Sequence, residues 1–320
     1  MADIALDRPA EAPRARAFDQ IFQGATWFSA IFILAVLAAV IGSLVIGALP
    51  AFMKFGWGFI TSDAWNPVKE EFGAWPAIYG TLVTSAIAML IGIPFALGIA
   101  IFITELCPPW LKRPIGTLVE LLAAIPSIIY GIWGLFVFAP FLQRHVQPLL
   151  IDSLGELPLV GDFFGGPPLG IGVLTAGLIL GIMVLPFISS IMRDVFETVP
   201  PMLKESAYGL GATTWEVIWN VVLPFTRTGV VGGIMLGLGR ALGETMAVTF
   251  VIGNAHRIQA SILSPGTTIS AALANEFTEA VGDLYLSSLI ALGFILFLIT
   301  FLVLAWAKWM LIRLQARAGI

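Results

Sequence analysis

Long apolar stretches without a charged side chain constrain this chain more than any other feature of its sequence. Five such stretches occur, at residues 20–53, 72–104, 121–143, 163–192 and 284–307. A sixth stretch of similar length, residues 228–256, contains Arg240 and Glu244. Because a helix rises 1.5 Å per residue, about 20 residues cross the hydrocarbon core of a bilayer. The sequence therefore predicts an all-α membrane protein with six transmembrane helices.

The composition supports a protein whose surface faces lipid. Of 320 residues, 58% are hydrophobic and 11% are charged, whereas about a quarter of the residues of a soluble domain carry a charge. The net charge is -4 and the basic residues are scattered, so we expect no nucleic-acid partner. Cys107 is the only cysteine. We expect no disulfide within the chain, no metal site and no cofactor.

The distribution of Lys and Arg predicts the orientation. Six spans place both termini on one side, and that side holds most of the basic residues; the other side holds only Lys54, Lys69, Arg144 and Arg257. The side with more Lys and Arg is normally cytoplasmic. We expect residues 1–24 to form a disordered cytoplasmic tail and residues 25–320 to form the six-span domain. Three tryptophans in the first outer loop, among them Trp65, are expected to lie at the membrane surface.

The longest internal loop on the basic side, residues 199–227, predicts two helices separated by a turn. Two consecutive prolines favour the start of a helix over residues 202–210, because proline in the first turn loses no hydrogen bond. Gly211 can adopt the left-handed conformation that ends such a helix. Thr213 and Glu216 have the spacing of a capping box for a second helix. We expect that second helix to end at Leu223-Pro224, where the chain re-enters the membrane.

The same loop carries a family pattern. Glu-Ser-Ala is followed after three residues by Gly, and after nine more by Val-x-Leu-Pro. This resembles the EAA loop of bacterial ABC importer permeases, in which the pattern is Glu-Ala-Ala, three residues, Gly, nine residues, Ile-x-Leu-Pro. Only residue types differ, at Ser206 and Val221. The matching positions are Glu205, Ser206, Ala207, Gly211, Leu223 and Pro224.

The resemblance implies a type I importer permease in the inner membrane. In that family the loop is a coupling helix that docks on a separate cytoplasmic ATPase subunit, a second permease subunit completes the pathway, and a periplasmic binding protein delivers the substrate. The sequence itself lacks a nucleotide site: none of its five lysines follows a glycine, so no GxxxxGK[ST] loop is possible. HExxH and GxSxG are also absent. We therefore expect a permease subunit without catalytic residues, with ATP hydrolysis on another chain.

The charged pair in the fifth span suggests contact with an anion. An arginine inside a membrane costs roughly 2.5 to 3.5 kcal/mol on insertion scales, so it needs a partner or a functional role. Arg240 is expected about halfway along its helix, with Glu244 one turn further on the same face. The two could form a neutral structural pair, or Arg240 could meet an oxyanion, since guanidinium suits phosphate oxygens. A proton relay in an ion-driven secondary transporter would also use these charges, but it would not explain the coupling loop.

A second resemblance concerns the substrate. Residues 237–248 are similar to the fifth-span signature of phosphate importer permeases of the C type. Further matches to that family lie at residues 55–59, 65–68, 76–82 and 125–131. The resemblance implies an A-type partner subunit, phosphate as substrate, and Arg240 and Glu244 in its pathway. Physical reasoning alone allows sulfate or molybdate equally well.

Two further predictions concern packing. Gly229, Gly233 and Gly237 recur every four residues, a spacing that lets another helix approach closely. We expect the fifth span to lie at the axis shared with the second permease subunit. Glu120, near the start of the third span, is expected at the cytoplasmic interface, and a third charge inside the membrane is the alternative for it.

Overall fold

The computed structural model describes residues 13–158 and 160–317, with side chains from 18 to 158 and from 160 to 313. Among these residues, six helical segments are long and apolar enough to cross a membrane: Phe18–Phe55, Trp75–Leu106, Ser127–Leu154, Val173–Glu197, Thr214–Leu242 and Asp283–Arg313. The prediction of an all-α protein with six spans is confirmed.

The chain forms two compact units, residues 1–47 and 48–320. Helix α1 (Pro13–Phe55) begins in the first unit and ends in the second. In the first unit its apolar side chains, such as Phe28 and Leu34, are exposed, as expected of a helix surrounded by lipid. Residues 13–24, half of the expected tail, belong to α1, and residues 1–12 lie outside the described part, so the disordered tail stays a prediction. No proline interrupts residues 14–24, so nothing in that segment stops the helix.

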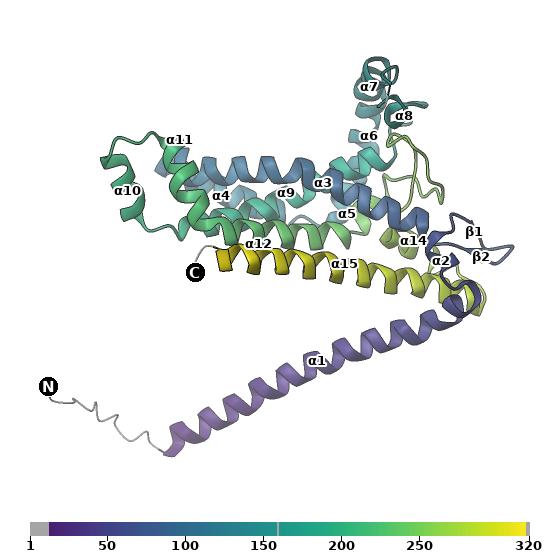
Figure 1. Cartoon of the computed structure of the whole chain (residues 1–320), viewed down its shortest axis with the longest axis horizontal. Coiled ribbons are helices and arrows are strands. Elements are labelled where there is room, and N and C mark those ends of the chain that lie inside the picture. Colours follow the sequence, from purple (N-terminus) through teal and green to yellow (C-terminus); the bar gives the residue numbers. More distant parts are fainter. Residues whose placement is uncertain (1–12, 159, 318–320) are drawn as a thin grey trace. The chain divides into compact units, whose positions relative to one another are not determined.

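The second unit contains the other five spans, which run side by side in Figure 1. Its first elements are the short helix α2 (Gly58–Thr61) and the antiparallel strands β1 (Trp65–Asn66) and β2 (Glu71–Phe72), with Trp65 opposite Phe72. The second span is α3 (Trp75–Ile101) with the π-helical turn η1 (Phe102–Leu106). The third comprises α5 (Ser127–Trp133), η2 (Gly134–Phe138), α6 (Ala139–Phe141), η3 (Leu142–Val146) and α7 (Gln147–Leu154).

The fourth, fifth and sixth spans follow the short helix α8 (Gly161–Phe164). The fourth is α9 (Val173–Glu197), and the sixth is α15 (Asp283–Arg317). Between them lie α10 (Pro201–Gly209), α11 (Thr214–Val217), η4 (Ile218–Val222), α12 (Leu223–Leu242), α13 (Met246–Thr249) and α14 (Ile269–Glu276). In Figure 1, α10 lies at one end of this unit, and α14 with β1 and β2 lies at the other. We call these the α10 end and the α14 end.

Helix α9 forms the centre of the second unit. Leu180, Val184 and Ile188 on this helix are completely buried. Gly177 and Gly181 bring it close to α3, since a Cβ at Gly177 would lie 2.7 Å from Ile87. Small residues allow such close helix contacts where lipid supplies no hydrophobic force between helices. The second and fourth spans therefore form one tightly packed pair.

The third span begins later than predicted. Residues 121–126 were expected to open it, but Leu121 belongs to a separate helix, α4 (Pro109–Ala123), and the span starts at Ser127. Pro126 precedes that start, and the residue before a proline is disfavoured in a helix. Glu120 therefore lies outside the six spans, on α4.

Candidate functional site

The loop at the α10 end has the predicted local structure. Helix α10 covers Pro201–Gly209, and Gly211 adopts φ +89° in the turn that follows. Thr213 Oγ1 accepts from the backbone N–H of Glu216 at 3.4 Å, and Glu216 Oε2 accepts from the N–H of Thr213 at 2.8 Å. The predicted capping box is confirmed.

The second helix does not end at Leu223-Pro224 as predicted. Segments α11, η4 and α12 form one continuous helical run from Thr214 to Leu242. Proline removes one backbone donor and crowds the preceding turn, and the wider π-helical turn η4 ends at Val222, two residues before Pro224. A π-helical turn accommodates the missing donor and the crowding by the proline ring without breaking the helix. The loop is thus joined rigidly to the fifth span.

Helix α10 has an inner and an outer face. Ala207 and, beyond the turn, Ala212 pack against the core that is centred on α9. Glu205 and Ser206 are exposed, as are the apolar side chains of Met202 (75%) and Leu210 (90%). Exposed apolar side chains next to a charged residue are typical of a protein–protein docking surface.

The fifth span ends earlier than predicted, and this corrects the position of its two charges. Helix α12 ends at Leu242, so Arg240 lies in its last turn rather than halfway along a helix. Glu244 lies beyond that end, and its Oε1 accepts from the backbone N–H of Ala247 at 3.2 Å, at the start of α13. Gly239 and Gly243 weaken a helix here, and the carboxylate satisfies a donor that the new helix leaves free.

Arg240 and Glu244 do not form the ion pair that one interpretation required. Among the described residues, no ion pair within 4.0 Å joins them. The Arg240 guanidinium instead lies over the Phe187 ring of α9, 5.2 Å from its centroid, a favourable cation–π contact. The third span crosses close to this break, because a Cβ at Gly131 would lie 3.0 Å from the Met246 carbonyl oxygen.

The glycines of α12 are used within the chain. A Cβ at Gly229 would lie 2.5 Å from Val195, one at Gly233 3.0 Å from Ile191, and one at Gly237 2.5 Å from Ile188, all on α9. This stripe brings the fourth and fifth spans together, so its spacing supports no contact with a second subunit. The spacing itself could not show which helix would occupy the stripe.

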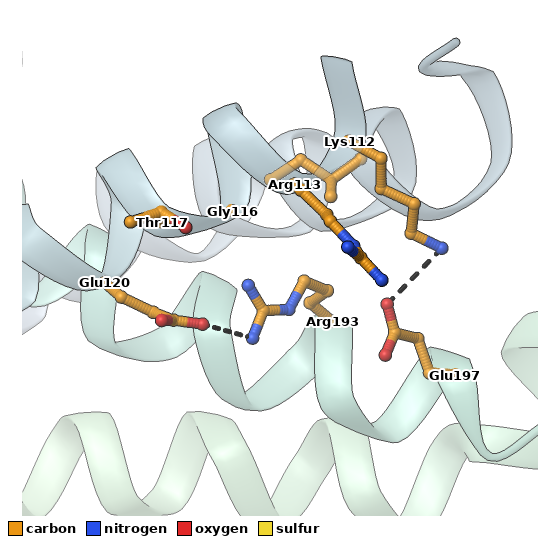
Figure 2. A pocket seen from close by; sticks show the side chains of 8 residues that line it. Lys112, Arg113, Gly116, Thr117, Glu120, Arg193 and Glu197 are labelled. Atoms are coloured by element: carbon orange, nitrogen blue, oxygen red, sulfur yellow. Dashed lines mark hydrogen bonds and ion pairs between the residues drawn. The ribbon is translucent and has the colours of Figure 1, made fainter. Parts of the chain in front are cut away.

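A polar pocket of about 410 Å³ lies between α4 and α9 at the α10 end. Figure 2 shows Arg193 reaching across it to Glu120, with a 2.7 Å ion pair. Lys112 pairs with Glu197 at 3.3 Å. A Cβ at Gly116 would lie 2.8 Å from the Arg193 guanidinium, so the end of this side chain packs directly on the glycine. These two ion pairs attach α4 to α9, and the Arg113 cation also lines the pocket.

Sequence reasoning missed a partly buried cluster at the α14 end. Glu276 accepts hydrogen bonds from Trp65 Nε1 at 2.7 Å, from the Tyr285 hydroxyl at 2.6 Å, and from His256. The rings of Trp65 and His256 stack with centroids 4.7 Å apart. Trp65 is therefore part of this cluster, and its expected position at the membrane surface stays a prediction. Its four members come from four separate segments, which no local pattern relates.

The environment of Glu276 changes its pKa. Burial by itself raises the pKa of this carboxyl, but the donors His256, Tyr285 and Trp65 favour the charged form more strongly. The pKa of Glu276 therefore lies below its ordinary value of 4.5. The cluster joins the β1–β2 hairpin to α14 and the sixth span through a charged acceptor.

The sequence of this chain matches a known protein family over most of its length. Residues 92–315 match the family described as "Binding-protein-dependent transport system inner membrane component". The chain belongs to this family. It is a multi-pass inner membrane protein, and the matched residues include the α10 loop and the end of α12.

Among its relatives are phosphate transport system permeases. The chain is 62% identical to "Phosphate transport system permease protein PstC" of Mesorhizobium japonicum, over 99% of this chain and 97% of that protein. It is 58% identical to the protein of the same name from Pasteurella multocida, over 93% of each chain. A probable PstC of Methanocaldococcus jannaschii is 38% identical over 84% of this chain and 85% of its own length.

Solved structures show the same fold at low sequence identity. A chain of a bacterial alginate ABC transporter, in complex with alginate pentasaccharide-bound periplasmic protein, has a TM-score of 0.60 and 20% identity, covering 94% of this chain and 97% of that one. A chain of the inward-facing MetNI methionine ABC transporter has a TM-score of 0.54 and 16% identity, covering 78% and 98%. The type I importer permease fold is therefore confirmed.

Proposed function

We propose that this chain is the C-type permease subunit of an ATP-driven importer of inorganic phosphate. The observation that carries the proposal is its 62% identity to a PstC protein over 99% of the chain. On this proposal an A-type permease completes the pathway, a periplasmic phosphate-binding protein delivers the substrate, and a separate ATPase supplies the energy. The α10 end and both termini face the cytoplasm.

Helix α10 is the element that docks on the ATPase. Its outer face presents Met202, Glu205 and Leu210 to solvent, while Ala207 faces the core. An apolar surface with one charge buries well in a protein groove. Because α11 continues without a break into the fifth span, movement of the loop carries directly into the membrane.

Arg240 and Glu244 meet phosphate at the interruption of the fifth span. Broken helices in transporters commonly place their ends at the substrate pathway, where charged side chains and helix ends can meet an ion. Arg240 offers a permanent cation whose planar donors suit phosphate oxygens. Glu244, held at the start of α13, repels an anion and so limits how tightly phosphate is held. The cation thus acts from the last turn of α12, and the carboxylate acts from the link between α12 and α13.

One growth and uptake experiment tests the substrate and the energy source. The gene is deleted and restored, and uptake of labelled phosphate and labelled sulfate is measured with and without the ATPase subunit. We expect the deletion to abolish phosphate uptake, and the restored gene to recover it only when the ATPase is present. Recovery of sulfate rather than phosphate uptake would assign another oxyanion. Uptake that persists without the ATPase would indicate an ion-driven secondary transporter.

A pair of arginine variants tests the role of the fifth span. Arg227 lies on the same helix, α12, but is exposed near its start, so it provides a matched control. We expect Arg240→Gln to assemble with its partners and to lose phosphate uptake, while Arg227→Gln keeps it. Equal uptake by the two variants would show that Arg240 is not part of the pathway.

A further inference from the structure

Glu105 is a buried carboxylate at the end of the second span. It lies in the π-helical turn η1, and its side chain is only 6% exposed. The adjacent residues Ala100 and Ile103 are buried as well. A buried carboxylate is stable only with a partner that compensates the loss of water. The location of that partner therefore determines what this end of the span is attached to.

The partner of Glu105 comes from the coupling loop. Lys204 of α10 forms an ion pair and hydrogen bond with Glu105 Oε1 at 2.5 Å, and the two residues are 99 positions apart in the chain. The Lys204 side chain is 20% exposed. Lys204 and Ala207 are three residues apart, so they share one face of α10, the face that points toward the core. Glu205 lies on the outer face.

This pair differs from another Lys–Glu pair at the same end of the unit. The side chains of Lys112 and Glu197 are 37% and 47% exposed, so water can replace either partner at little cost. Water has little access to Glu105. Any displacement of α10 relative to the second span must therefore either move Glu105 with it or leave a buried charge unpaired.

We propose that the Glu105–Lys204 pair is the polar joint through which α10 moves the second span. The proposal rests on the proposed function of α10 as the ATPase-coupling element. Helix α11 transmits loop movement to the fifth span through the continuous backbone, whereas the second span has no such backbone link to the loop. The joint supplies that link, and the close packing of α3 on α9 at Gly177 passes the movement to the fourth span.

The test separates coupling from stability. Removing one partner leaves a buried charge, but neutralising both, as in Glu105→Gln with Lys204→Met, commonly restores stability. The complete transporter is reconstituted with ATPase and binding protein, and three quantities are measured: assembly, thermal stability, and phosphate imported per ATP hydrolysed. Lys112→Met is the control from the exposed pair. Lys204→Arg keeps the charge.

We expect each single neutralisation to lower phosphate import per ATP by about tenfold or more, because the two partners can no longer move as one unit. The double variant should regain stability while its import per ATP remains low. Lys204→Arg and Lys112→Met should stay within about twofold of the natural protein. If the double variant regains both its stability and its phosphate import per ATP, the pair only stabilises the fold and the proposal is overturned. Failure of the double variant to assemble would overturn it too.

A reference variant distinguishes failure of the joint from failure of the proposed function. Glu205→Lys reverses the charge on the outer face of α10 without touching the joint. If Glu205→Lys uncouples the ATPase but the joint variants do not, only the joint is refuted. If none of these variants affects coupling, α10 is not the coupling element.

Discussion

Replacing Gly237 by alanine tests the packing that positions the fifth span. A Cβ at this position would lie 2.5 Å from two atoms of Ile188 and 3.3 Å from Val184. Ordinary contact begins at 3.4 Å, so the new methyl group overlaps by roughly 1 Å with the normal packing distance. Both neighbours are completely buried on α9. Neither can turn outward, so α12 has to move away from α9.

Gly232 on the same helix is the matched control, because a Cβ there meets no atom of this chain within 4 Å. Both substitutions gain about 1 kcal/mol of helix propensity, which cancels in the comparison. Overpacking in a filled core costs about 1 to 3 kcal/mol. We therefore expect the free energy of unfolding of Gly237→Ala to be about 1 to 3 kcal/mol lower than that of Gly232→Ala.

The assay is thermal or denaturant unfolding of the purified complex in detergent, combined with phosphate uptake in vesicles. Arg240 lies three residues beyond Gly237, so displacement of α12 also shifts Arg240 relative to Phe187. Uptake should fall for Gly237→Ala and be preserved for Gly232→Ala. Equal stability and equal uptake of the two variants would refute the close packing of α12 on α9.

Three other results are expected. Gly211→Val places a β-branched residue at φ +89°, a backbone conformation that is strained for any residue except glycine. We expect this variant to recover less ATPase in a pull-down. Undiminished recovery would show that the turn tolerates valine. Because the folded pKa of Glu276 is lowered, its contribution to stability is complete above pH 4.5 and is lost as the pH falls below that value. Glu276→Gln should therefore lose less stability than the natural protein on acidification, and parallel losses would contradict this. With Cys107 replaced by serine, external thiol reagents should label cysteines introduced at Asp63 and Glu156 but not at Lys112; the reverse pattern would invert the orientation.

The boundaries of the fifth span show what local sequence could not predict. Residues 228–256 contain little charge, so hydropathy alone continues the helix past Arg240. The structure ends it at Leu242. Beyond that end the Glu244 carboxylate accepts from the N–H of Ala247 in α13, and the third span crosses at Gly131. A helix end depends on which neighbour occupies the adjacent space as well as on propensity. The same dependence explains why the glycine stripe was recognised but its occupant, α9, was not.

The sequence by itself determined six spans, the α10 helix with its glycine turn and capping box, and the family. Each of these rests on residues that are close in the chain, such as Thr213 and Glu216. Only the tertiary structure decided the partners of the charged side chains: Lys204 for Glu105, Phe187 for Arg240, and His256 for Glu276. A charge removed from water requires a compensating group. That group can come from any segment that the fold brings near, so spacing along the chain does not identify it.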